Sequence, residues 1–281
     1  MKPDDLRTLI DHADKVVVLE IPTSDASVLY ESSARQDLDA LKRATRVSVP
    51  EGTLHCMCIG SPAIDLYSKG QRIVRITNHH AELLRCELWK SDAPIVDSEA
   101  FLKWFDERKI AGPRAEWDDG IKDQQRSETN RQRWLDAMPP SLKPLWPTVE
   151  QSLDGPTDIA PLHRALVKDV PDEPERIRAL LSWYGSGAGP WSGFPSYEVA
   201  AENLLLRYPT RSIVAAIEGR ELSAAQTEGA ARLFGGWSFS RGRPDDRRLL
   251  PQDLKQRLLA HSLKSSNEDK RRRAQRAFGE R

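Results

Sequence analysis

Hydrophobic and polar positions alternate most clearly between residues 54 and 89, where short runs rich in Ile, Val, Leu and Tyr are separated by turn residues. Turn residues between β-rich runs of this length predict an antiparallel meander. The four predicted strands span residues 54–59, 63–68, 71–77 and 83–89. Side chains alternate between an apolar face and a mostly polar face, as in a sheet that is covered on one side only.

All three cysteines fall on the predicted apolar face of this sheet. Cys56 and Cys58 share it on the first strand, and Cys86 lies on it in the fourth. A free thiol in such a position behaves as a small hydrophobe. We therefore expect the three cysteines to be buried structural residues.

The rest of the N-terminal part predicts helices and two further strands. Residues 98–109 predict a helix with an apolar side that covers the sheet, formed by Phe101, Trp104 and Phe105. Shorter helices are expected at 4–14 and 37–44, and strands at 16–21 and 27–31. The fold class predicted for residues 1–112 is an α+β domain, an antiparallel meander sheet with covering helices.

Residues 113–133 are polar and charged with almost no apolar spacing, so we interpret them as a polar linker. Beyond it, residues 134–281 predict an α-helical domain without strands. Its expected helices span residues 158–169, 173–184, 196–207, 209–219, 222–235, 251–263 and 267–278.

The helical half also carries a weak internal repeat with an offset of 54 residues. Trp183 aligns with Trp237 and Pro190 with Pro244, while Leu204-Leu205 aligns with Leu258-Leu259. Helix–loop–helix similarity at a fixed period is typical of HEAT or armadillo solenoids, although this period is longer than a plain HEAT unit. The second domain is therefore predicted to be a HEAT/armadillo-like array.

Composition narrows the class of protein. Hydrophobic residues make up 39% and charged residues 30% of the 281 residues, and the formal net charge is zero. The molecule as a whole gives no electrostatic reason to bind nucleic acid or a membrane, and no apolar run has the length of a membrane span. Three cysteines and an acidic N-terminal stretch favour a cytoplasmic protein without disulfides or a signal peptide.

A zinc site is the alternative interpretation of the central block. Cys56 and Cys58 would supply thiolates, and His79 and His80 would supply imidazoles. Two features count against it. Only one residue separates the cysteines, and a simple meander puts the second strand between Cys58 and the histidine turn. We therefore expect no cofactor, with zinc as the alternative.

No catalytic motif is recognisable. The loop GSGAGPWSGFP, residues 185–195, lacks the Gly-Lys-Ser/Thr ending of a Walker loop and the preceding strand of a dinucleotide loop. Gly189-Pro190-Trp191-Ser192-Gly193 does not form a nucleophile elbow, because the glycine two residues before the serine is missing. The sequence favours a protein that is not an enzyme.

Aromatic residues in two loops of the helical domain are candidates for binding another protein, since aromatic side chains anchor interfaces. Alternatively, they seal the ends of adjacent helices. The candidates are Trp183, Trp191, Phe194, Tyr197, Trp237 and Phe239.

The C-terminal segment is the one strongly charged region. From Arg241 onward there are 13 Lys or Arg and 6 Asp or Glu residues, a net charge of +7. Such a run could neutralise phosphates or simply solvate the outer face of a capping helix. The candidate nucleic-acid residues are Lys270, Arg271, Arg272, Arg273 and Arg276.

The block CMCIGSPAIDLYSKGQRIVRITNHHAELLRCELW, followed by FLKWF, resembles a module of uncharacterised bacterial proteins. The helical half, with PWSGFPSYEVAAENLL and EGAARLF, is similar to their HEAT-like partner region. The resemblance implies no activity and no functional residue. The leading expectation is a bacterial adaptor, regulator or immunity-type protein that binds another protein. The alternatives are a metal-binding protein or metalloenzyme centred on Cys56, Cys58, His79 and His80, and nucleic-acid binding through the basic C-terminus.

Overall fold

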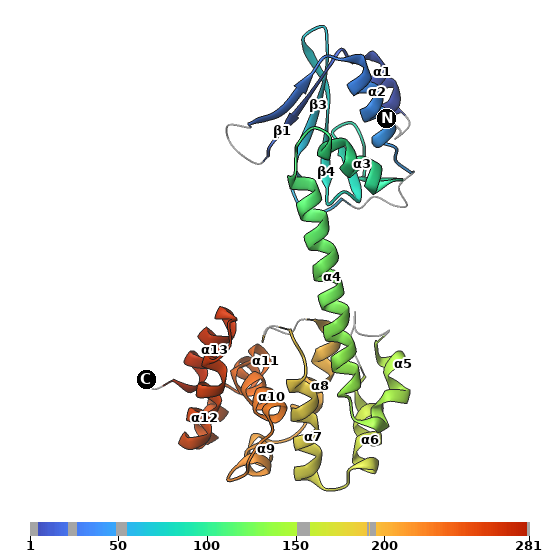
Figure 1. The fold of residues 1–281 in the computed structure, drawn as a ribbon. Coiled ribbons are helices and arrows are strands. Elements are labelled where there is room, and N and C mark those ends of the chain that lie inside the picture. Colours follow the sequence, from blue (N-terminus) through green and yellow to red (C-terminus); the bar gives the residue numbers. More distant parts are fainter. Residues whose placement is uncertain are drawn as a thin grey trace. The chain divides into compact units, whose positions relative to one another are not determined.

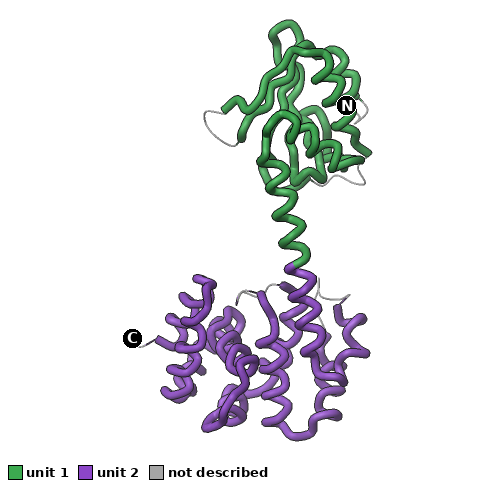
Figure 2. The backbone as a smooth tube through the Cα atoms, viewed as in Figure 1, with its two compact units in different colours: residues 1–125 green, residues 126–281 purple. Residues whose placement is uncertain are grey.

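The computed structural model describes residues 5–21, 27–48, 55–150, 158–189, 191 and 195–279. The chain divides into two compact units, unit 1 (residues 1–125) and unit 2 (residues 126–281), which Figure 2 shows in different colours. Unit 1 contains an antiparallel sheet and unit 2 is helical. The predicted order, an α+β part followed by an all-α part, is therefore confirmed.

Unit 1 contains a six-stranded sheet and three helices, and a fourth helix begins there. The strands are β1 (Lys15–Leu19), β2 (Val28–Ser32), β3 (Ala63–Ser68), β4 (Gln71–His79), β5 (Leu83–Cys86) and β6 (Ala93–Pro94). The helices are α1 (Asp5–His12), α2 (Arg35–Ala44), α3 (Ser98–Asp106) and α4 (Gly112–Asp136).

The strand order is β2-β1-β3-β4-β5-β6, and all neighbours are antiparallel. β3, β4 and β5 confirm three of the four strands predicted for the central block. The first predicted strand is wrong: residues 55–59 form no strand, and Leu54 lies outside the described residues. β1 occupies the position beside β3, because its consecutive valines Val16, Val17 and Val18 suit a central strand that is buried on both faces.

Helices α1, α2 and α3 cover one face of the sheet (Figure 1). The expected alternation holds along β3, β4 and β5, and the predicted covering helix is confirmed as α3, whose Trp104 is buried. The core between the helices and the sheet includes Leu6, Ile10, Val16, Val18, Leu38, Leu41, Ile64, Leu66, Val74, Ile76, Leu84, Cys86, Phe101 and Phe105.

The segment expected to be a polar linker, residues 113–133, lies inside helix α4. Its residues are mostly exposed, as its polar composition predicts, but Glu, Lys, Gln and Arg are all good helix formers. Local ion pairs such as Asp119 with Lys122, at 2.9 Å, support the helix. The division between the two units falls within this helix, after Gln125.

Unit 2 is built from short helices that surround one core. Every predicted helical window contains a helix, whereas the 54-residue repeat stays a prediction. The elements after α4 are η1 (Pro140–Leu145), α5 (Trp146–Glu150), α6 (Ala160–Asp169), α7 (Glu173–Gly185), η2 (Ser196–Glu198), α8 (Val199–Leu205), α9 (Thr210–Ile217), α10 (Ala224–Gly235), α11 (Trp237–Gly242), η3 (Pro244–Leu249), α12 (Gln252–Leu263) and α13 (Glu268–Phe278). None of the helices in the described parts of the chain is long and apolar enough to cross a membrane.

Helices α7 and α10 pack at very short range, because glycine faces backbone on both sides. A Cβ atom on Gly229 would lie 1.9 Å from the carbonyl oxygen of Leu181. We therefore expect Gly229→Ala to lower the free energy of unfolding by about 3 kcal/mol, since a backbone obstacle cannot rotate away. Urea denaturation followed by tryptophan fluorescence measures this effect. Gly242→Ala, where the added Cβ meets nothing within 4 Å, is the control and should change stability by less than about 0.5 kcal/mol.

Candidate functional site

Residues 55–61 cross the face of the sheet that the helices leave uncovered. The Arg85 guanidinium on β5 donates to the carbonyl oxygens of Cys56 and Cys58, at 2.6 and 3.4 Å. The Asp92 carboxylate accepts the backbone N–H of Cys56 at 2.8 Å. Polar side chains of the sheet therefore hold this segment by its backbone.

The expectation that all three cysteines lie in the apolar core is correct for Cys86 alone, which is 1% exposed. Cys56 and Cys58 are half-buried in a loop on the opposite face. The alternation rule failed for them because it presumed a strand. The objection that another strand separates Cys58 from the histidine turn fails for the same reason.

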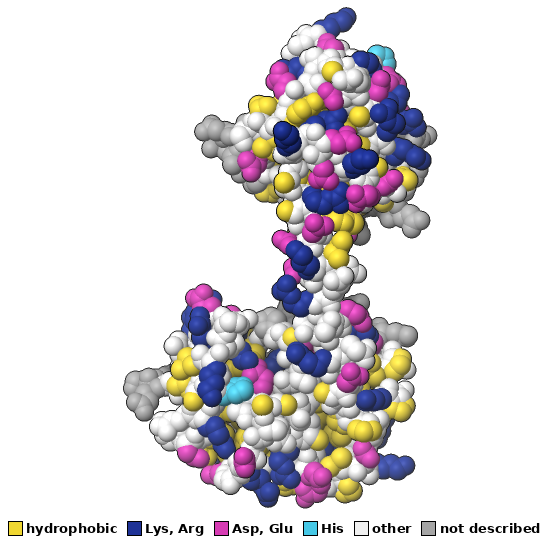
Figure 3. All heavy atoms as spheres, in the orientation of Figure 1, with side chains coloured by type: hydrophobic (Ala, Val, Ile, Leu, Met, Phe, Trp, Pro, Cys, Tyr) yellow, Lys and Arg dark blue, Asp and Glu magenta, His cyan; other side chains and the backbone are white. Residues whose placement is uncertain are grey.

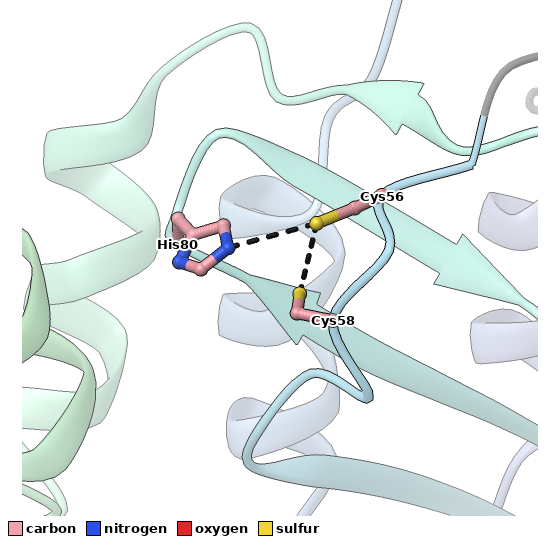
Figure 4. Close-up of side chains that lie close together, drawn as sticks. All are labelled: Cys56, Cys58 and His80. Carbon is pink, nitrogen blue, oxygen red and sulfur yellow. Dashed lines mark hydrogen bonds between the residues drawn. The ribbon is translucent and has the colours of Figure 1, made fainter. Parts of the chain in front are cut away.

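Two thiols and two imidazoles meet where this loop passes the end of β4. The Sγ atoms of Cys56 and Cys58 are 2.9 Å apart. His80 Nε2 lies 3.6 Å from Cys56 Sγ, and His79 Nδ1 lies 2.9 Å from Cys58 Sγ. Figure 4 shows the two sulfurs and the His80 ring pointing toward one another. Donor atoms of Cys56, Cys58 and His80 all lie within 4.8 Å of each other, so these three can contact one ion.

The backbone around the cluster adopts left-handed conformations. His80 and Ala81, in the turn between β4 and β5, have φ angles of 60° and 57°, which side chains other than glycine rarely adopt. Each such residue costs about 1–3 kcal/mol, and backbone strain of this kind is common at functional sites. Gly60 (φ 79°) passes so close to His79 that an added Cβ would lie 2.7 Å from its Nε2 atom. The turn and the glycine together set both imidazoles against the loop.

Each histidine is also held through its other ring nitrogen. His80 Nδ1 lies 2.8 Å from the Glu116 carboxylate on α4, and His79 Nε2 lies 3.0 Å from the Thr77 hydroxyl on β4. A carboxylate only accepts hydrogen bonds, so Nδ1 of His80 carries a proton and donates it to Glu116. The opposite nitrogens of both rings are the ones that face the sulfurs.

The two thiols differ in proton affinity although their sulfur atoms are in contact. Hydrogen bonds from the Cys58 thiol and from its backbone N–H lower the pKa of Cys56, and His80 adds to this effect. Burial, together with the neighbouring sulfur of Cys56, raises the pKa of Cys58. The pair therefore favours a thiolate at Cys56 and a thiol at Cys58 in the absence of an ion.

The two histidines shift in opposite directions. Burial and the positive charge of Arg85 lower the pKa of His79, so its imidazole is neutral near pH 7. Burial disfavours the charged form of His80 as well, but hydrogen bonds to Cys56 and Glu116 outweigh it and raise the pKa of His80. The cluster thus contains a neutral imidazole, a readily charged imidazole and an activated thiol.

Asp92 fastens the loop below the sulfurs. Its carboxylate is 1% exposed and bonds Arg85 Nε at 2.8 Å and His55 Nδ1 at 2.7 Å, in addition to the N–H of Cys56. Burial would raise the pKa of Asp92, but these hydrogen bonds and the charge of Arg85 outweigh it and lower the pKa to about 2. Asp92 is therefore ionised throughout the neutral range.

The four candidate metal donors are recognisable in the sequence, whereas the residues that hydrogen-bond to them or to their loop are not. Thr77 and Arg85 lie on the predicted polar face of their strands. This alternation predicts the side of the sheet on which they lie but not the residues that they contact. Asp92 and Glu116 are ordinary acidic residues in their local sequence, and only folding brings them to residues 36 positions away.

The aromatic residues predicted to bind a partner are mostly internal. Trp183, Trp191 and Phe239 are at most 3% exposed, and Tyr197 is partly buried against Trp134 with ring centroids 5.3 Å apart. They belong to the core of unit 2 or pack against it, which agrees with the alternative that they seal the ends of adjacent helices. Contact with a partner stays a prediction. Phe194 lies outside the described residues, and Trp237 remains exposed at 55%.

The basic residues predicted to contact nucleic acid all lie on α13, where they differ in exposure and in ion pairing. Lys270 bonds the half-buried Glu228 carboxylate at 2.5 Å, and Arg273 pairs with Asp269 at 2.7 Å. Arg271 is partly buried, while Arg272 and Arg276 are exposed.

No family model matches this chain, and neither a curated protein nor a solved structure matches it. The resemblance to bacterial modules therefore stays a prediction. What this protein does has to be inferred from the geometry of the cluster itself.

Proposed function

We propose that this protein binds a zinc ion through the sulfurs of Cys56 and Cys58 and the imidazoles of His79 and His80. The observation that carries the proposal is the convergence of Cys56, Cys58 and His80, whose donor atoms all lie within 4.8 Å of one another. His79 Nδ1, 2.9 Å from Cys58 Sγ, is the candidate for the fourth donor. Thiolates and imidazoles are the donors that Zn²⁺ prefers, and four of them complete a tetrahedral site.

The separations support an ion of this size. Zn–S bonds of about 2.3 Å and Zn–N bonds of about 2.0 Å place a sulfur and a nitrogen of one tetrahedral site about 3.5 Å apart. Cys56 Sγ and His80 Nε2 are 3.6 Å apart. The two sulfurs are 2.9 Å apart, closer than two thiolates on one zinc ion. Loading is expected to separate them to about 3.8 Å, the edge between two zinc thiolates.

The second contacts of the histidines favour ligation over a chance cluster. Histidines that bind a metal commonly donate their other N–H to a carboxylate or another acceptor, which fixes the ring orientation. The bond from His80 to Glu116 has this arrangement, and the Thr77 hydroxyl contacts Nε2 of the His79 ring. Both rings thus turn a lone pair toward the sulfurs.

With four protein donors, the ion would have no open coordination position, and its role would be structural. It would join residues 56–58 to the end of β4 and the turn that follows it. The protein would then be a zinc-binding protein in which the ion stabilises the fold of unit 1 and takes part in no reaction.

Metal analysis of the purified full-length protein tests the proposal. We expect one zinc ion per chain, lost on Cys56→Ser and on His80→Ala because each change removes a donor. Cys86→Ala and His12→Gln are matched controls, since the first removes a thiol from the core and the second an exposed histidine. Both controls should keep the ion. Zinc at 100 times its Kd should stabilise the wild-type chain by about 2.7 kcal/mol and the Cys56→Ser variant much less.

Cobalt supplies an independent readout. Co²⁺ in place of zinc should give a sulfur-to-metal charge-transfer band that Cys56→Ser weakens and Cys86→Ala leaves unchanged. A reduced wild-type chain that takes up neither ion would refute the proposal. So would zinc that survives removal of both Cys56 and Cys58.

A further inference from the structure

Unit 2 contains an arginine-rich hollow, whereas the cysteine–histidine cluster belongs to unit 1. The hollow has a volume of about 380 Å³, and its lining includes Trp237, Ser240, Arg247, Arg272, Arg273 and Arg276, which we name the arginine cleft. These residues come from α11, η3 and α13, so three separate elements build it. A second hollow of about 690 Å³ shares Arg247 and Arg276 with the cleft and adds Arg248 and Lys255. The charged side chains that line the two hollows are mostly basic, with Asp269 in the first and Asp245 in the second.

The positive charge of this surface is only partly neutralised. Arg273 pairs with Asp269 at 2.7 Å, and Arg272 lies 3.9 Å from Glu268, a long separation between exposed groups. Arg276 is exposed and has no ion-pair partner among the described residues. Lys and Arg side chains also line the edge of unit 2 that α12 and α13 form (Figure 3). The surface is therefore built to meet negative charge.

Trp237 supplies an aromatic surface within the same cleft. Its side chain is 55% exposed, in contrast to the buried Trp183 and Trp191. The Arg241 guanidinium lies 6.0 Å from the centre of its ring. An exposed indole beside several guanidinium groups offers a flat face for stacking together with charges that bind phosphate.

We propose that the arginine cleft binds a single-stranded nucleic acid, with a base stacked on Trp237 and phosphates on Arg272 and Arg276. Stacking platforms combined with a basic groove are how proteins hold single strands without reading sequence. An acidic protein surface would pair with the arginines but would leave the exposed indole without a role. The folded structure supplies the aromatic residue that the basic run lacks in sequence, because α11 brings Trp237 to α13. This inference does not depend on the zinc site.

Fluorescence anisotropy with labelled dT12 and rU12, using the full-length chain, tests the proposal. We expect both to bind, with an affinity that falls as salt rises. The double variant Arg272→Ala/Arg276→Ala should reduce the slope of log K against log salt by about 1.4, because each lost phosphate contact removes about 0.7. Trp237→Ala should weaken binding by about fivefold or more, and Trp237→Phe, which keeps an aromatic face, by less.

Arg211→Ala removes an exposed arginine of α9 and is the matched charge control, which should bind like the wild type. The relative affinities of dT12 and rU12 distinguish DNA from RNA as the source of the strand. Absence of binding at low salt would overturn the proposal. Binding that Trp237→Ala leaves unchanged, or that a poly-glutamate peptide reproduces with equal affinity, would overturn it as well, the latter in favour of an acidic protein partner.

Discussion

Replacing Arg232 with methionine is expected to lower the free energy of unfolding by about 3–5 kcal/mol, because it leaves the buried Glu198 carboxylate without its counter-ion. The two side chains form an ion pair in the core of unit 2 and are at most 2% exposed. Arg232 also donates to the carbonyl oxygen of Tyr184 at 3.2 Å and stacks on its ring at 4.4 Å. After the substitution, Glu198 keeps the hydrogen bonds from the backbone N–H groups of Ala188 and Gly189.

Urea denaturation should be measured for Arg232→Met, Glu198→Gln and the double variant. These three variants and the wild type form a double-mutant cycle, which separates the interaction energy of the ion pair from the cost of burying each side chain. The double variant should recover part of the stability lost in Arg232→Met, since it buries no unpaired charge. Arg211→Met, at an exposed position, is the control. A loss below about 1 kcal/mol in Arg232→Met would contradict a buried pair at this place.

This ion pair also decides how the glycine-rich loop is interpreted. Residues 185–195 have the composition of a surface connection, but Ala188 and Gly189 donate to the Glu198 carboxylate, and Gly187 leaves no room for a side chain beside Arg232. Its glycines therefore wrap the backbone around a buried carboxylate of the same chain. In the described part of the loop Trp191 is buried, whereas Ala188 is exposed.

Asp92→Asn is expected to have the second large effect, lowering the stability of unit 1 by about 2–3 kcal/mol at pH 7. The change removes the negative charge that faces Arg85 and weakens the bond that holds the backbone of Cys56. Since outer contacts of this kind set the position of metal donors, zinc affinity should also fall by about 10–100-fold. Urea denaturation and zinc titration measure the two effects, and exposed Asp118→Asn is the control.

In the metal-free chain, the difference in stability between the wild type and Asp92→Asn is expected to depend on pH. The pKa of Asp92 is about 2 in the folded state and near 3.8 in the unfolded chain. A depressed folded-state pKa contributes stability that is present above the unfolded value and is lost as pH falls through the folded value. The difference between the wild type and Asp92→Asn should therefore be constant above about pH 5 and shrink between pH 4 and pH 2. A difference that does not change with pH would contradict the assigned role of the carboxylate.

The strands of the sheet were predictable where apolar and polar side chains alternate, and the prediction was wrong for the loop that precedes β3. Residues 63–68 and 71–77 alternate between apolar and polar side chains, and both are strands whose apolar side chains fill the core. Cys56 and Cys58 stand two positions apart, as side chains on one face of a strand would, but Met57 between them is apolar too, and residues 56–58 form a loop. A three-residue pattern does not distinguish a strand from a turn, because the choice depends on which neighbour supplies backbone hydrogen bonds. Here side chains of Arg85 and Asp92 supply them.

The sequence by itself determined an antiparallel sheet covered by a tryptophan-bearing helix, a following helical part, and the identity of four metal-type donors. These follow from local patterns, because apolar periodicity decides which side of each element is buried. Only the tertiary structure decided that Cys56 and Cys58 face His79 and His80, that most of the loop aromatics lie in the core, and that Trp237 stands beside the arginines of α13. Each of these depends on contacts between residues at least 20 positions apart, which no local pattern encodes, since chain crossings are set by the packing of whole elements.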